Sequence, residues 1–229
     1  MAESFICSLQ FWSAFARTTI KVLHLRQRVT PKQGARILQL CQGLQQLSLK
    51  IATNLPDHQN PLGGPLATLP LTLLSLDLAS AFYGPMVSLT DLAVLNRIEH
   101  LHLTNSWVAR RGLYVGLPKL SQLTHISFPV QPTQNGICTE IVAFMLSVFH
   151  QLRVVILWHM PYQDSQAIYD LLEERGLLDR RVVVFNAAWF ECCAQSNSGI
   201  WGLGEMVLQW RSDRNHTGSL VSTICVLST

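Results

Sequence analysis

Charged side chains are scarce in this sequence. Asp, Glu, Lys and Arg make up 14% of its 229 residues, against about a quarter in a typical soluble domain. The net charge is +3 and the pI is near 8.6, whereas nucleic-acid-binding domains usually have a pI above about 9. The composition therefore predicts a largely uncharged surface and argues against a nucleic-acid-binding protein.

Long apolar runs are also missing. No run reaches the roughly 18 residues that a transmembrane helix needs, so we expect no membrane partner. The apolar stretch Phe5–Trp12 follows Glu3 and has no positively charged segment before it, which argues against a secretory signal. The six cysteines show no CxxC spacing, so neither a zinc site nor a redox pair is predicted. We expect a reducing, cytoplasmic or nuclear setting.

Motifs of catalysis are absent as well. The sequence contains no GxSxG, no GxxxxGK[ST] and no HExxH, the patterns of a nucleophile elbow, a phosphate loop and a zinc protease. The glycines of Gly199–Gly204 follow no predicted strand, as a dinucleotide-binding loop would require. The sequence therefore predicts a protein that is not an enzyme and has no cofactor.

What the chain has in abundance is one apolar spacing, LxxLxL. Its central copy is Ile98–Leu103, and the copies begin 24 to 29 residues apart. The other copies are Ile20-Leu23-Leu25, Leu44-Leu47-Leu49, Leu73-Leu76-Leu78, Leu123-Ile126-Phe128, Leu152-Val155-Leu157 and a weaker one that begins at Arg180 and ends in Val183 and Phe185. Periods of 20 to 50 residues indicate stacked repeats. Each copy predicts a strand, and stacking makes the strands parallel.

Helix signals lie between several copies. Thr30, Pro31 and Gln33 match a helix N-cap, a first-turn proline and a capping-box partner, which predicts a helix that ends near Gly43. Further helices are predicted over 88–96, 136–150, 164–176 and 200–211, whereas 54–70 and 112–120 lack a helical period and are predicted to be irregular crossings. The fold class is therefore α/β: a leucine-rich-repeat-like solenoid with about seven parallel strands on one face and helices or loops on the other.

The predicted organisation has three parts. Residues 1–19 form an N-terminal cap in which Trp12 and Phe15 cover the open end of the first strand, residues 20–190 form the solenoid, and residues 191–229 form a C-terminal capping helix and a flexible tail. Terminal units of a solenoid need such covers because one side of each lacks a neighbour. A monomer is expected.

The segments Ile37–Leu49, ILQLCQGLQQLSL, and Leu152–Trp158, LRVVILW, resemble the units of fungal F-box/leucine-rich-repeat proteins. The resemblance covers about residues 20–211 and implies substrate recognition for an SCF-type ubiquitin ligase. The regular asparagine ladder is missing, and no F-box is detectable in residues 1–19. The resemblance thus implies a truncated or variant member, which binds a Skp-type adaptor only if an F-box lies outside this chain.

The residues between the repeating leucines are predicted to line one surface, because side chains alternate across a strand. We expect this concave face to bind a protein partner. Its predicted site residues are Arg26, Lys50, Asp77, His100, His102, His125 and Trp158. Three alternatives stay open for the histidines: a metal site formed by His100, His102 and His125, a pH-sensitive patch, or ordinary solvated side chains. A chain without retained activity is a further alternative.

The last two repeats are apolar on the outward side too, at Val154, Ile156, Trp158, Val182 and Val184. A strand that is apolar on both faces is normally covered on both. We expect the C-terminal helix, with Trp201 and Trp210, to cover this side, and the alternative cover is a partner protein.

Overall fold

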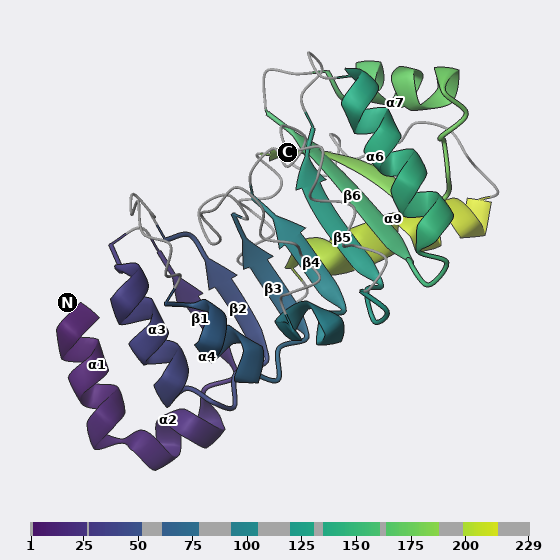
Figure 1. Ribbon diagram of the computed structural model, residues 1–229. Coiled ribbons are helices and arrows are strands. Elements are labelled where there is room, and N and C mark those ends of the chain that lie inside the picture. The colour runs from purple at the N-terminus through teal and green to yellow at the C-terminus, as the bar shows by residue number, and fades with distance from the viewer. Residues whose placement is uncertain are drawn as a thin grey trace, which may run out of the picture. The chain divides into compact units, whose positions relative to one another are not determined.

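The computed structural model describes residues 2–26, 28–51, 61–77, 93–104, 120–130, 135–160, 164–187 and 199–214. Its contacts divide the chain into two compact units, Met1–Leu123 and Thr124–Thr229 (Figure 1). Both units are α/β, and every strand in them runs parallel to the strands it pairs with. The order of the strands in each unit is their order in the sequence.

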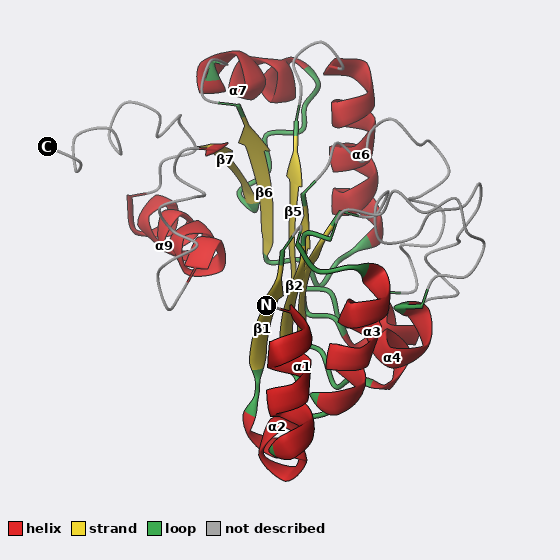
Figure 2. Cartoon of the chain, turned by 90° about the vertical axis from the view of Figure 1, so that its left-hand side faces the viewer, coloured by secondary structure: helices red, strands yellow, loops and turns green. Residues whose placement is uncertain are grey.

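The first unit begins with two helices, α1 (Ala2–Phe11) and α2 (Ser13–Thr19). The elements that follow are β1 (Val22–Leu25), α3 (Pro31–Leu40), β2 (Gln46–Leu49), α4 (Gly63–Thr68), β3 (Leu73–Leu76), the 3-10 helix η2 (Ala93–Arg97) and β4 (His100–Leu103). Figure 2 shows α3 and α4 on one side of this unit's strands, whereas α1 is drawn in front of the strands and α2 below them. The repeated leucines face this helix layer and form the core.

The capping signals predicted the start of α3 correctly. The Thr30 hydroxyl accepts a hydrogen bond from the Gln33 N–H, and the Gln33 side chain accepts one from the Thr30 N–H. Two otherwise unpaired backbone donors are satisfied in this way. Pro31 occupies the first helical turn, where a missing N–H costs nothing.

The N-terminal segment, predicted to be a cap, is helical. Helices α1 and α2 pack against α3 and extend the helix layer. Only Ile6, Leu9 and Ala16 of this segment are buried, whereas Trp12 and Phe15 are exposed. Trp12 and Phe15 therefore do not pack into the core, and the buried stripe of these helices consists of smaller residues. The capping role of residues 1–19 stays a prediction.

The third repeat is shifted by two residues from its predicted frame. Leu74 pairs with Leu47 and with Leu101, so the repeat is Leu71-Leu74-Leu76 and not Leu73-Leu76-Leu78. Both frames satisfy LxxLxL, and a shift of two residues keeps the same side chains inward. The leucine spacing alone could not distinguish the two frames.

The crossing predicted to be irregular over 54–70 contains α4, a short helix with two glycines and a proline. Pro65 lies in its first turn, where proline is tolerated. Such a composition gives no helical period, which explains the wrong prediction. Three predicted segments fall outside the described residues. They are the part of this crossing within 52–60, the crossing at 112–119 and the start of the helix at 88–92.

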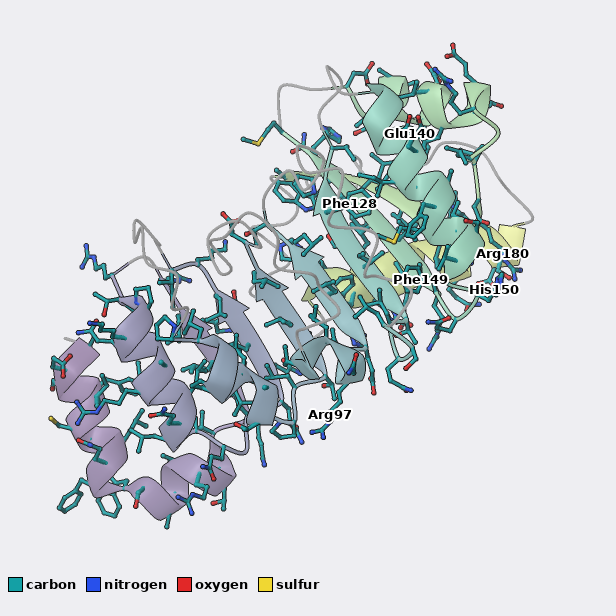
Figure 3. All side chains as sticks on the ribbon, in the orientation of Figure 1. Arg97, Phe128, Glu140, Phe149, His150 and Arg180 are labelled. Atoms are coloured by element: carbon teal, nitrogen blue, oxygen red, sulfur yellow. The ribbon has the colours of Figure 1, made fainter. Side chains whose placement is uncertain are left out.

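The second unit contains β5 (His125–Pro129), α6 (Asn135–Val148), β6 (Val154–His159), α7 (Ser165–Glu174), β7 (Val182–Asn186) and α9 (Gly199–Arg214). The three predicted helices are confirmed, and Asp164 caps α7 as expected by accepting from the Gln166 N–H. Figure 2 shows α9 on the opposite side of these strands from α6. Phe128 and Phe149, labelled in Figure 3, are among the largest fully buried side chains. The predicted tail from residue 215 lies outside the described residues.

The last strand is shifted by one residue from its predicted frame. Val182 pairs with Val155, and Val184 pairs with Leu157. Since partners in a parallel pair point to the same face, Val182 and Val184 point inward and Val183 points outward, the reverse of the prediction. A shift of one residue exchanges the two faces of a strand. The exchange is tolerated because all of these side chains are apolar and buried.

Candidate functional site

The candidate site is the outward face of the first unit's strands, opposite its helices. The pairing aligns the outward side chains in rows across β1 to β4: Val22, Gln46, Leu73 and His100 form one row, and His24, Ser48, Ser75 and His102 form the next. Neighbouring strands lie about 4.8 Å apart. Polar and imidazole side chains from separate repeats therefore come together on one face.

A third row follows where the strands end. Continuing the register places Lys50, Asp77 and Thr104 beside one another. The Lys50 N–H donates to the Leu25 carbonyl at 2.8 Å, and the Thr104 N–H donates to the Leu76 carbonyl at 3.0 Å. Asp77 thus lies in the row of Lys50, whereas the predicted frame placed it in the row of His102. Arg26, at the end of β1, is exposed.

His102 has the most perturbed side chain on this face. Desolvation by burial and the nearby Lys50 charge lower the pKa of His102 to about 3. Its imidazole is consequently neutral at physiological pH and is unsuited to be a pH sensor there. A neutral ring keeps one donor and one acceptor nitrogen, which suits recognition of a polar group.

His125 does not lie on an open surface. It is only 3% exposed; its Nδ1 lies 2.8 Å from the Thr124 hydroxyl and its Nε2 lies 3.2 Å from a Glu205 carboxylate oxygen. That oxygen also receives the Arg153 guanidinium at 3.0 Å, and the Trp201 ring packs edge-on against the imidazole. His125 therefore joins β5 to α9 within the second unit.

Helix α9 covers the apolar outward face of the second unit, as predicted. Trp201, Gly204, Val207 and Arg211 are buried and recur every three or four residues along one side of the helix. A Cβ on Gly204 would lie 2.9 Å from a Val154 methyl and 3.1 Å from an Ile156 methyl. The glycine thus allows the helix to approach β6 closely. Trp201 is buried, and Trp158 and Trp210 are half-buried.

The free edge of β7 is occupied by side chains from two helices. Arg211 of α9 donates to the Val182 carbonyl at 2.7 Å and to the Tyr169 hydroxyl at 3.1 Å. Tyr169 of α7 in turn accepts from the Val184 N–H at 3.2 Å. An edge strand otherwise presents unpaired backbone groups on which another chain can assemble. These two side chains satisfy two such groups, the Val182 carbonyl and the Val184 N–H.

No group of three or more His, Cys, Asp or Glu side chains in the described ranges is arranged to hold a metal ion. His125 is engaged with Thr124 and Glu205, and the positive charge of Lys50 next to His102 opposes a cation there. The three-histidine metal site stays a prediction without added support.

Four residues of the second unit's outward side escaped prediction: Tyr169, Gly204, Glu205 and Arg211. Their roles depend on which face of the helix packs against the sheet. The spacing of residues within the helix does not by itself show which neighbours that face contacts. One signal was present, because the spacing of Trp201, Gly204, Val207 and Arg211 is that of a buried helix stripe. A glycine in such a stripe indicates close approach of backbone.

None of the helices in the described part of the chain is both long and apolar enough to span a bilayer. Comparisons with protein-family models, curated proteins and solved structures find no match for this chain. The geometry of the two outward faces therefore carries the functional argument.

Proposed function

We propose that the chain is a non-enzymatic protein-interaction module that binds its partner through the outward face of the first unit. The residues of this face that we assign to binding are Arg26, Lys50, Asp77, His100 and His102. One observation carries the proposal: α3 and α4 lie on the opposite side of this unit's strands, whereas in the second unit α9 packs on the outward side chains Val154 and Ile156.

The chemistry of the face supports recognition of a polar surface. The rows bring together two imidazoles, a lysine and a carboxylate on a rigid parallel sheet. Half-buried polar groups lose little further hydration on binding and can form hydrogen bonds that specify a partner. The exposed Lys50 offers a hydrogen-bond donor, and the neutral His102 lies in the adjacent row.

The wider setting follows from the leucine spacing. We infer that the parallel strands with returning helices form a leucine-rich-repeat solenoid, and that the chain recognises substrates of an F-box-type ubiquitin ligase. The parallel strands in chain order support the solenoid. The ligase role depends on the resemblance of Ile37–Leu49 and Leu152–Trp158 to F-box/leucine-rich-repeat units.

A capture experiment tests the interaction face. The intact chain and a Lys50→Ala/His100→Ala variant are immobilised side by side, and bound proteins are quantified by mass spectrometry. A Lys32→Ala/Gln39→Ala variant is the matched control, because both residues are exposed on α3 in the opposite layer. Loss of a protein from the first variant alone supports the face.

Two results would count against the proposal. Identical proteins captured by all three chains, each shown to be folded by circular dichroism, would move recognition elsewhere. A purified Skp-type adaptor that does not bind the chain would remove the ligase setting and leave the interaction module standing. The two parts of the proposal can therefore fail separately.

A further inference from the structure

Three aromatic side chains project from the turn between α1 and α2. Phe11 is 79% exposed, Trp12 is 64% exposed and Phe15 is 57% exposed. The rings of Phe11 and Trp12 touch edge to face, with centroids 5.1 Å apart. We name these three residues the aromatic turn. Soluble proteins expose single apolar residues routinely, but adjacent exposed aromatic rings mark a site of interaction.

The segment that contains the aromatic turn is rich in basic residues. The first 51 residues contain seven Lys and Arg and a single acidic residue, Glu3. Glu3 is already engaged, since it accepts from the Gln33 amide at 2.7 Å and lies 3.9 Å from the Arg36 guanidinium. Arg17 and Lys21, in and just after α2, are exposed. The segment therefore combines exposed aromatic rings with uncompensated positive charge.

The combination of exposed aromatic rings and positive charge favours one kind of binding partner over another. A second copy of the chain would bring two basic segments together, and like charges at an interface repel. Phe and Trp beside Lys and Arg are the composition with which helices lie in the interfacial region of anionic membranes. Rings at a helix turn, flanked by the small residues Ser13 and Ala14, can enter the headgroup region with little loss of polar hydration.

We propose that the aromatic turn docks the chain on the surface of an anionic phospholipid bilayer. Phe11, Trp12 and Phe15 enter the boundary between headgroups and acyl chains, while Arg17 and Lys21 contact lipid phosphates. The attraction of these two cations to the anionic surface falls off within a Debye length. The bilayer is bound at its surface and is not crossed. This proposal is independent of the protein-binding face on β1 to β4.

Co-sedimentation of the full chain with vesicles tests the proposal. One set of vesicles is phosphatidylcholine alone, and the other is two parts phosphatidylcholine to one part phosphatidylserine. We expect binding to the anionic vesicles to exceed binding to the neutral ones by about tenfold and to weaken as NaCl is raised. A Trp12→Ser/Phe15→Ser variant is expected to lose about tenfold in partitioning. Both residues are largely exposed, so the fold is retained.

A Leu178→Ser/Met206→Ser variant is the matched control, because it removes two exposed apolar side chains of the second unit. It should bind vesicles as the unmodified chain does. Equal binding by the aromatic-turn variant, equal binding to both lipid mixtures, or no binding at all would overturn the proposal. So would self-association without lipid, seen by analytical ultracentrifugation, that the Trp12→Ser/Phe15→Ser change abolishes.

Discussion

The outward faces of the two units differ, although the same leucine spacing builds both. In the first unit the side chains between the leucines include the polar residues Gln46, Ser48, His100 and His102. In the second unit the corresponding side chains of β6 are Val154 and Ile156, and α9 packs on them. The inward leucines therefore determine the strands, and the alternating residues determine whether the chain covers its own face.

Replacing Trp201 by alanine should produce the largest difference between the two faces. The ring is buried beside His125, and truncation of a buried Trp costs about 3–5 kcal/mol of unfolding free energy. Gln46→Ala, at an exposed outward position of the first unit, should change the unfolding free energy by less than about 0.5 kcal/mol. Urea unfolding of both variants measures the comparison, and equal losses would show that α9 does not support the second face.

Replacing Arg211 by methionine should cost about 2–3 kcal/mol, because a charged hydrogen-bond donor is lost and the Val182 carbonyl and Tyr169 hydroxyl lose their shared partner. The variant should also form larger species at high concentration, since an edge strand has lost its cover. Unfolding and light scattering check these two outcomes. Exposed Arg153→Met provides a control, and a variant at position 211 as stable as the control would contradict the role of Arg211.

Gly204→Val should cost about 2 kcal/mol, since the added side chain overpacks against Val154 and Ile156. Gly64→Ala is the counterpart in the first unit, where an added Cβ meets no atom within 4 Å, and should stay within about 0.5 kcal/mol. Chemical unfolding reports both. Tolerance of valine at position 204 would mean that α9 lies farther from β6 than the structure shows.

The last prediction concerns pH and belongs to the first unit. Desolvation and Lys50 lower the pKa of His102 to about 3 from its ordinary 6.5, so the folded state resists a proton that the unfolded chain accepts. The resulting stability is complete above pH 6.5 and is lost progressively as the pH falls toward 3, by about 1 kcal/mol per pH unit. Unfolding of the native chain and His102→Gln between pH 7 and 5 should show the steeper loss in the native chain. If the unfolding free energies of the two proteins changed equally with pH, His102 would not be the cause of the pH dependence.

Much of the fold could be predicted because its signals are local. LxxLxL marks an alternating, half-buried strand, and Thr30 or Asp164 marks a helix start by its own hydrogen bonds. The register of β3 and β7 could not be predicted, since Leu71 and Leu73 both begin a valid repeat and Val182 and Val183 are equally apolar. In such strands, packing against elements distant in the sequence determines the register, and the sequence of the strand alone does not predict it.

The candidate site residues also separate into those that local patterns predict and those that depend on distant contacts. The rows of His100 and His102 with Lys50 follow from alternation within strands, so they could be expected. The burial of His125 depends on Glu205, which lies 80 residues away in the sequence. Contacts of this kind arise from the path of the chain between the two residues and leave no local pattern.

The occupied edge of β7 bears on how a protein of this kind can grow. Duplication of a repeat lengthens an array by inserting a strand beside an existing one. At β7 a new strand would have to displace the Arg211 guanidinium and the Tyr169 hydroxyl from the backbone of Val182 and Val184. Insertion of a strand elsewhere in the sheet meets no such barrier, so a strand added by engineering belongs before β7, with α7, β7 and α9 kept together.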